Sequence, residues 1–329
     1  AASAVQIVPE IVEEAGQIHL FQRTANWVMP KMDDPSSEED LDRLRNDPAA
    51  TRALRQMIFE QVDAGMTFSD PNALAELEAS VLEAIEEVKD PELREKLRPQ
   101  HPFGCKRPLL SNSYYPAFNR SDLELGTDPI DRVTKNSILT ADGTERRVDT
   151  LVIATGFRAT KYLSAIDVRG RGGQSIEEAW SDGASAYLGV TTAGFPNLFM
   201  LYGPNTNNGS IIEMIECQVD HALQLIGHIA DEDQGWIDVR KQPMERYNED
   251  VQEAIRGVDV WQAGCNGYYR TPSGRIVTQW PLSMSEFRKR TSRIDSSAFD
   301  RGSSTAPSGD NLGGRLLDSV PSPSEKNAN

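Results

Sequence analysis

The stretch Ile18-His19-Leu20-Phe21-Gln22-Arg23-Thr24 decides the fold, because a short apolar strand here ends in a cation and a hydroxyl. The residues before it, 3–15, carry apolar side chains at helical spacing and predict a helix that bends at Pro9 and ends at Gly16. A helix leading directly into a buried strand is typical of a parallel sheet. The chain is therefore expected to begin with an αβ unit of an α/β fold.

The same unit fits the first part of a dinucleotide-binding domain, in which a G-x-G-x-x-G/A turn precedes the helix. Ala1-Ala2-Ser3-Ala4 fits the end of this turn, with Ala4 at its third small position. At the end of the next strand an acidic residue favours NAD, whereas an arginine accommodates the 2′-phosphate of NADP. Arg23 and Thr24 stand there and predict an NADP phosphate site, because a guanidinium can grip phosphate with two hydrogen bonds. A surface arginine at a strand end is the alternative.

Residues 34–98 form an acidic stretch that three Asp-Pro pairs divide. Aspartate caps helix N-termini and proline suits the first helical turn, so each pair predicts a helix start. The pairs are Asp47-Pro48, Asp70-Pro71 and Asp90-Pro91. Ser36 with Glu39 predicts a capping box for the first helix. We therefore expect three or four short helices, inserted into the surrounding domain, with their negative charge facing solvent.

The α/β pattern resumes near Pro108. Strands are predicted at 122–125, in a β-meander over 130–152 with a tight turn at 141–144, and in the apolar runs 150–154 and 196–201. A long helix is predicted over 210–230 from apolar residues at helical spacing. After Arg290 the chain is rich in Ser, Gly, Asp and Pro, which predicts a disordered tail over 291–329.

The charge and cysteine content of the chain limit which macromolecules and metals it is expected to bind. The net charge is -16 and the isoelectric point about 4.8, which argues against nucleic acid or an anionic membrane as a partner. The three cysteines stand far apart without C-x-x-C spacing, which predicts neither a disulfide framework nor a metal site and suits a reducing, cytoplasmic compartment. The sequence leaves the oligomeric state open.

Three further loops carry residues suited to a flat or phosphorylated ligand. Lys106 and Arg107 place two cations on a shaped loop between a glycine and a proline, where a solvated basic pair is the alternative. Thr155-Gly156 follows a predicted strand, and ligands bind at such strand ends in open parallel sheets. The loop Asn205 to Ser210 precedes the long helix, whose free N–H groups suit an electron-rich carbonyl edge.

The order of these motifs resembles the flavoprotein Baeyer–Villiger monooxygenases, which are relatives of the flavin-containing monooxygenases. The likeness covers nearly all of residues 1–290. It rests on Ser3-Ala-Val-Gln6, Phe21-Gln-Arg-Thr-Ala-Asn-Trp-Val-Met-Pro30, Cys105-Lys-Arg-Pro-Leu109, Tyr114-Tyr115, Phe118-Asn-Arg120, Ala154-Thr-Gly-Phe157, Gly194-Phe-Pro-Asn-Leu-Phe199 and Gly203-Pro-Asn205.

The resemblance implies an α/β fold of two interleaved dinucleotide-binding, Rossmann-like domains with an α-helical insert. Residues 1–33 and 102–153 would form the NADPH-binding domain, 34–101 the insert, and 154–290 the C-terminal half of the FAD-binding domain. The family's first G-x-G-x-x-G and its F-x-G-x-x-x-H-x-x-x-W-[P/D] signature are not in the sequence. We therefore expect an incomplete FAD domain and a chain that is an N-terminally truncated fragment, inactive if this glycine motif is essential.

The resemblance also implies roles for single residues. Arg23 and Thr24 match the family's 2′-phosphate site, Lys106 is similar to a lysine that assists there, and Arg107 matches the active-site arginine. Tyr268 stands in a substrate-side loop where many relatives have tryptophan. The other cofactor contacts implied are Ser3, Ala4, Gln6, Thr155, Gly156, Asn205, Gly209 and Ser210.

The implied activity uses FAD and NADPH to insert one oxygen atom of O2 next to the carbonyl of a small-molecule ketone. The product is an ester or lactone, formed through a C4a-peroxyflavin, and the flavin supplies the difficult chemistry. Two alternatives remain. One is a flavin monooxygenase that oxygenates nitrogen or sulfur, and the other is a non-catalytic NADP-binding fragment.

Overall fold

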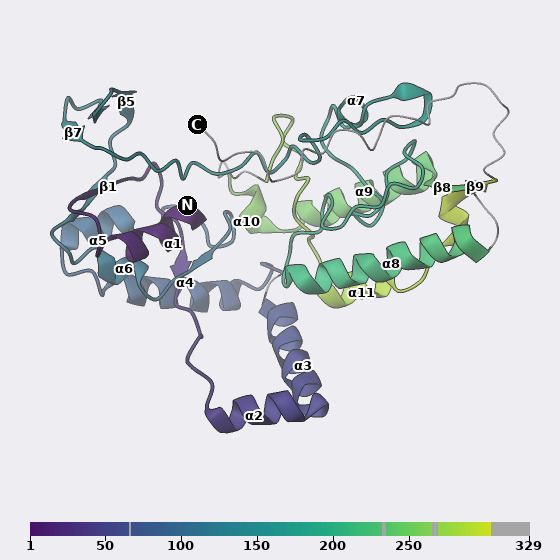
Figure 1. Ribbon diagram of the computed structural model, residues 1–329, viewed down its shortest axis with the longest axis horizontal. Helices are drawn as coiled ribbons and strands as arrows, with labels where there is room; N and C mark the ends of the chain where they lie inside the picture. The colour runs from purple at the N-terminus through teal and green to yellow at the C-terminus, as the bar shows by residue number, and fades with distance from the viewer. Residues whose placement is uncertain (66, 232–234, 265–266, 268, 304–329) are drawn as a thin grey trace, which may run out of the picture.

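The computed structural model describes residues 1–303 except 66, 232–234, 265–266 and 268. Figure 1 shows one group of helices around the short strands near the N-terminus and a second group around the long helix α8 (Ile211–Asp231). Helices α2 (Glu38–Asn46) and α3 (Pro48–Gly65) project from the body between these two groups.

The N-terminal part is built on two parallel strand pairs, as the sequence predicts. Helix α1 (Ala2–Ile11) leads into β1 (Ile18–Phe21), which pairs in parallel with β4 (Leu123–Gly126). Strand β2 (Val28–Met29) pairs in parallel with β3 (Leu109–Leu110). The helix is shorter than predicted, since Pro9 lacks the N–H of a final-turn hydrogen bond and the helix ends two residues later.

The insert contains α2, α3, α4 (Pro71–Ile85) and α5 (Pro91–Leu97). The predicted Asp-Pro starts are confirmed. Asp70 and Asp90 each accept hydrogen bonds from two backbone N–H groups in the first turn of their helix. The cap of the first helix differs by one residue from the prediction, because Ser37 rather than Ser36 accepts the N–H of Asp40, at 3.1 Å.

The predicted meander is confirmed. Strands β5 (Ile130–Val133), β6 (Ser137–Thr140) and β7 (Glu145–Arg147) form an antiparallel sheet. The turn between β6 and β7 includes Gly143 at φ +86°, a conformation that glycine adopts without strain. Helix α6 (Tyr114–Ala117) lies earlier in the chain and packs against α1.

The strands predicted at 150–154 and 196–201 are wrong, because neither segment forms a strand. A strand needs a neighbour to satisfy its backbone N–H and C=O groups, and none runs beside these segments among the described residues. The first segment exposes apolar side chains as a result. Leu151 is 51% exposed, Ile153 76% and the following Phe157 93%.

The C-terminal part packs α11 (Met284–Thr291) along α8. Strand β8 (Trp236–Val239) pairs with β9 (Phe299–Gly302) in antiparallel register, and Phe299 is buried. The predicted disordered tail is therefore wrong for residues 291–302, and residues 304–329 lie outside the described part. The remaining helices are η1 (Arg171–Gly173), α7 (Ile176–Ala179), α9 (Lys241–Arg256), α10 (Asp259–Gln262) and η2 (Ser296–Ala298).

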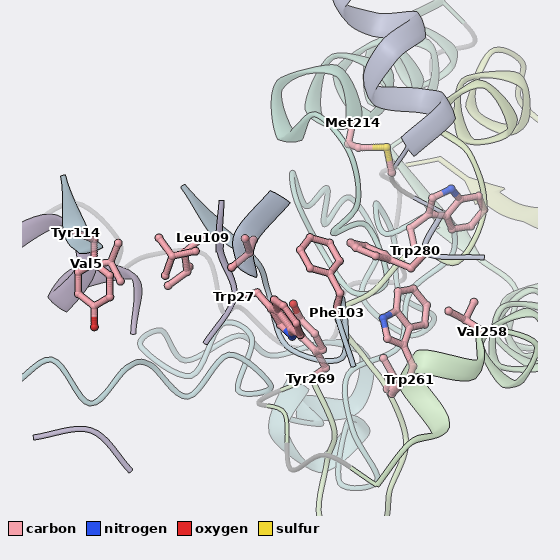
Figure 2. Packing of buried hydrophobic residues seen from close by; sticks show 14 of the residues in the cluster. Val5, Trp27, Phe103, Leu109, Tyr114, Met214, Val258, Trp261, Tyr269 and Trp280 are labelled. Carbon is pink, nitrogen blue, oxygen red and sulfur yellow. The ribbon is translucent and has the colours of Figure 1, made fainter. Parts of the chain in front are cut away.

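One hydrophobic core joins the two parts, as Figure 2 shows. At its centre Trp27 packs against Phe103, with ring centroids 5.8 Å apart, and its Nε1 donates to the carbonyl of His101 at 2.8 Å. From the other side Trp261 Nε1 donates to the carbonyl of Gly104 at 3.2 Å. Two tryptophans from distant parts of the sequence therefore fix the loop that leads into Lys106.

Candidate functional site

The parallel pairing of β2 and β3 brings two distant segments together. The N–H of Leu109 donates to the carbonyl of Trp27 at 2.8 Å, and Asn26 Nδ2 donates to the carbonyl of Arg107 at 3.1 Å. Arg107 lies two residues before β3, just as Asn26 lies two residues before β2, and Lys106 precedes Arg107. The segment that follows the first predicted strand is therefore held against the backbone of the Lys-Arg pair by β2, β3 and Asn26.

Two cations in these segments, Arg23 and Lys106, lie close enough to interact electrostatically. Burial lowers the pKa of Lys106 from its usual value, and the positive charge of Arg23 lowers it further. Arg23 and Thr24 are exposed just beyond Gln22, which follows β1, so their polar groups are accessible. No carboxylate within the described part of the chain forms an ion pair with Arg23, Lys106 or Arg107. The structure thus concentrates positive charge at the place where the sequence predicts a phosphate.

His101 lies near Lys106, and the sequence analysis did not predict it as a site residue. Burial lowers its pKa to about 4, with a further contribution from the charge of Lys106. Both ring nitrogens are buried without a hydrogen-bond partner, and the ring stands edge-on to Trp27. The only sequence signal was its place at the start of the loop that carries Lys106. The imidazole is therefore neutral at pH 7 and adds no charge to the cluster.

The loop before α8 is rigidly built. Asn205 is 1% exposed, has φ +54°, and donates from Nδ2 to the carbonyls of Ile276 and Gln279 at 3.0 and 2.8 Å. The predicted contact residue Asn205 therefore uses its amide nitrogen to shape the loop, while its Oδ1 is buried without a partner. Gly203 approaches a second backbone so closely that a Cβ there would lie 2.2 Å from the carbonyl oxygen of Gly189.

Gln218 holds together the two backbone segments that approach each other here, 202–203 and Gly189. It is fully buried on α8, accepts the N–H of Tyr202 at 2.7 Å and donates to the carbonyl of Gly189 at 3.0 Å. Sequence reasoning missed it, because a polar residue on a helix is usually assigned to the solvent face. A glutamine among the apolar positions of α8 was the available signal.

The first turn of α8 presents free backbone donors. The N–H of Ser210 donates to Met284 Sδ at 3.1 Å, and the Oγ of Ser210 accepts the N–H of Glu213 at 3.3 Å. The N–H groups of Ile211 and Ile212 have no acceptor among the described residues. Helix N-termini with free N–H groups favour electron-rich ligand atoms. Gly209, also predicted as a contact, packs against Met284.

The other predicted residues are not brought together by any contact in the described structure. Ser3 and Gln6 are exposed on α1, and Ala4 is half-buried. Thr155 and Gly156 are exposed in the irregular segment after residue 150. Tyr268 lies outside the described residues.

Two cysteine findings bear on the sequence predictions. Cys105, which precedes the cationic pair, is disulfide-bonded, so the prediction that the cysteines form no disulfide is wrong for it. Cys217 is a free, buried thiol, and burial raises its pKa to about 11.

Metal sites and membrane spans are both absent from the part of the chain that the structure describes. No group of three or more His, Cys, Asp or Glu side chains could hold a metal ion there. No helix in the same residues has both the length and the apolar character that crossing a membrane requires.

Comparison with known sequences identifies relatives along most of the chain. It is 38% identical to a Baeyer–Villiger monooxygenase of Pseudomonas aeruginosa over 91% of its own length and 58% of that protein. It is 36% identical to a Baeyer–Villiger monooxygenase of Streptomyces coelicolor, covering 89% of this chain and 58% of that one. The chain therefore spans a little over half the length of these relatives. No protein-family model matches it.

Solved structures of monooxygenases share the fold of this chain. A crystal structure of OTEMO in complex with FAD and NADP is similar at a TM-score of 0.77, with 27% identity, over 92% of this chain and 65% of that one. Cyclohexanone monooxygenase in a closed form reaches a TM-score of 0.80 at 23% identity, over 92% of this chain and 66% of that one, which concerns the fold alone. The predicted α/β fold class is confirmed. Over the nine tenths of its length that these comparisons cover, the chain belongs to the family of the flavoprotein Baeyer–Villiger monooxygenases.

Proposed function

We propose that the chain is the NADPH-binding part and the C-terminal flavin-binding part of a monooxygenase that converts a small-molecule ketone into an ester or lactone. The relatives named Baeyer–Villiger monooxygenases support this proposal, as does the similar OTEMO structure, which is a complex with FAD and NADP. The observation within the chain that carries it is the pair of unneutralised cations, Arg23 and Lys106.

The residues present fit the phosphate of NADP. Two neighbouring cations without a carboxylate repel each other, and a bound anion would relieve this repulsion for both. Arg23 offers a planar guanidinium for paired hydrogen bonds, and Thr24 adds a hydroxyl donor beside it. A 2′-phosphate needs such a group, whereas the ribose hydroxyls of NAD are better served by a carboxylate. The cluster therefore favours NADPH over NADH.

The residues around α8 fit the flavin of FAD. Free N–H groups of Ile211 and Ile212 point from the helix start, which suits the electron-rich carbonyl edge of an isoalloxazine ring. The rigid loop before them, fixed by Asn205 and Gln218, would hold this edge in place. When bound there, FAD would supply the redox chemistry with NADPH and O2, and the residues of the chain would supply its position. Arg107 would add a fixed positive charge that stabilises negative charge developing during oxygen transfer.

The phosphate site is tested by calorimetric titration of the purified chain with NADP+ and NAD+. Arg23→Ala should weaken NADP+ binding about 10- to 100-fold, because hydrogen bonds to charged groups contribute about 1.5–3 kcal/mol. NAD+ binding should stay unchanged. Arg132→Ala, which removes an exposed arginine from β5, is the matched control and should affect neither ligand. If Arg23→Ala weakens the binding of NADP+ and NAD+ equally, Arg23 does not bind the 2′-phosphate.

The flavin half is tested by the visible absorption spectrum after incubation with FAD and removal of free flavin. Retained flavin bands would justify NADPH-oxidation assays with ketones and mass analysis for esters. Oxygenation of a sulfide with no ester from any ketone would select the heteroatom-oxygenating alternative. A colourless protein that still binds NADP+ would support the alternative of a non-catalytic NADP-binding chain.

A further inference from the structure

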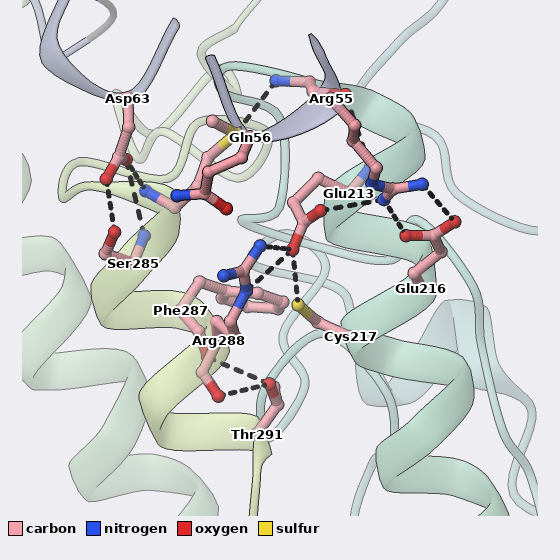
Figure 3. A network of polar contacts seen from close by, with 12 residues as sticks. Arg55, Gln56, Asp63, Glu213, Glu216, Cys217, Ser285, Phe287, Arg288 and Thr291 are labelled. Atoms are coloured by element: carbon pink, nitrogen blue, oxygen red, sulfur yellow. Dashed lines mark hydrogen bonds and ion pairs between the residues drawn. The ribbon is translucent and has the colours of Figure 1, made fainter. Parts of the chain in front are cut away.

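One face of helix α3 reaches the two helices that flank the predicted flavin loop. Arg55, Phe59 and Asp63 follow each other at four-residue spacing and so lie on one side of α3. Figure 3 shows this side facing α8 and α11. The loop 205–210 leads into α8, and its last residue contacts the first residue of α11. The projecting insert therefore meets the body of the protein at the flavin loop.

Arg55 binds the first turns of α8. Its guanidinium pairs with Glu213 at 3.1 Å and with Glu216. The side chain of Glu213 is only 8% exposed and also accepts two hydrogen bonds from Arg288 of α11, at 2.7 and 2.9 Å. The guanidinium of Arg288 in turn lies 4.1 Å from the ring centroid of Phe59. Burial alone would raise the pKa of Glu213, but hydrogen bonds from Arg288 and Arg55 outweigh it and lower the pKa, so the carboxylate stays ionised.

Asp63 binds the start of α11. Its carboxylate accepts the N–H of Met284 at 2.5 Å, the N–H of Ser285 at 3.3 Å and the hydroxyl of Ser285. Met284 then contacts the loop, because its Sδ accepts the N–H of Ser210 and would lie 2.5 Å from a Cβ at Gly209. Met284 thus links Asp63 of the insert to the loop.

We propose that Arg55 and Asp63 are positioning residues through which the helical insert holds the loop 205–210 in the conformation that receives the flavin. This inference rests on the proposed function, in which that loop contacts FAD. The two residues act on the ends of different helices, Arg55 on α8 and Asp63 on α11. Their hydrogen bonds reach the loop through Glu213 and Met284, each of which bonds to Ser210 through its N–H or Sδ.

The test is hydrogen exchange of the flavin-free chain, followed by mass spectrometry of peptides that cover 203–214. The N–H groups of Asn207 and Met214 are protected there by carbonyls of Thr278 and Ser210. Asp63→Ala should speed exchange in this region about tenfold, because it removes hydrogen bonds worth about 1.4 kcal/mol. Asp63→Asn keeps an acceptor oxygen and should restore most of the protection. Arg43→Ala, which removes an exposed ion pair within α2, should leave exchange unchanged.

A charge swap tests Arg55. Arg55→Glu should speed exchange at 203–214, and adding Glu216→Arg should restore it, because the ion pair between α3 and α8 re-forms with its charges exchanged. Unchanged exchange with Asp63→Ala, or an equal increase in the distant strand β8, would overturn the proposal. These measurements contain no flavin, so they stand or fall independently of whether the chain binds FAD. The absorption spectrum with FAD reports on the proposed function separately.

Discussion

Replacing Gly203 by alanine places a methyl group where two backbones cross. The new Cβ would lie 2.2 Å from the carbonyl oxygen of Gly189 and 3.1 Å from its carbonyl carbon. Ordinary carbon–oxygen contacts need more than about 3 Å, so a backbone segment must move by about 1 Å. A rotamer change cannot relieve the clash, since the obstacle is a peptide group that Gln218 holds in place. Overpacking of this kind lowers the free energy of unfolding by about 1–3 kcal/mol, and we expect about 3 kcal/mol here because the obstacle is a backbone group.

The assay is thermal unfolding followed by circular dichroism, with Gly227→Ala as the control. Gly227 lies inside α8 with no atom within 4 Å of a new Cβ, so alanine there should stabilise the helix by about 0.5–1 kcal/mol. Since each kcal/mol corresponds to about 2–4 °C in proteins of roughly 150–250 residues, Gly203→Ala should lower the midpoint by several degrees and Gly227→Ala should raise it slightly. If Gly203→Ala unfolds at the wild-type temperature, the close approach of Gly203 to Gly189 that precedes the loop 205–210 is not present in solution.

Three other residues have testable roles. In the flavin-loaded enzyme, Arg107→Ala should still oxidise NADPH but release hydrogen peroxide instead of ester, and ester formation at the wild-type rate would contradict the proposed role. The pKa of His101 is lowered from 6.5 to about 4 in the folded state, so the unfolded chain binds the proton more readily and the free energy of unfolding should fall as pH drops through this window. His101→Phe should flatten that dependence in urea titrations at several pH values, and an unchanged slope would exclude His101 as its source. Asp70→Ala removes the cap that accepts two N–H groups of α4 and should cost about 1 kcal/mol in the same titrations, whereas Asp70→Asn should cost much less.

Local chemistry was predictable from the sequence. Each Asp-Pro pair starts a helix, because capping depends only on residues within one turn. The meander formed as predicted, since its turn residues and alternating strands lie close together in the sequence. The phosphate role of Arg23, and that of Lys106 implied by the family resemblance, stay predictions, although the structure places the two charges within interaction range.

Features that depend on distant partners were not predictable. The apolar run 150–154 has the composition of a buried strand, yet a strand forms only beside a neighbour, and composition does not reveal whether one is present. The segment after Arg290 has the composition of a disordered tail, but Phe299 anchors it in a core that other elements supply. His101 and Gln218 gave no pattern at all, because their roles come from burial by residues elsewhere in the chain.

The pairing of β2 with β3 also determines when the cationic site can exist during synthesis. Asn26 and Arg107 meet across 81 positions of sequence. At translation rates of about 5–20 residues per second, Lys106 emerges roughly 4–16 s after Arg23. During that interval Arg23 has been synthesised but Lys106, the second cation of the proposed phosphate site, has not. In the function proposed above, the nascent chain would gain coenzyme affinity in a single late step, and the free energy of NADP binding would then oppose reopening of the two-residue strands.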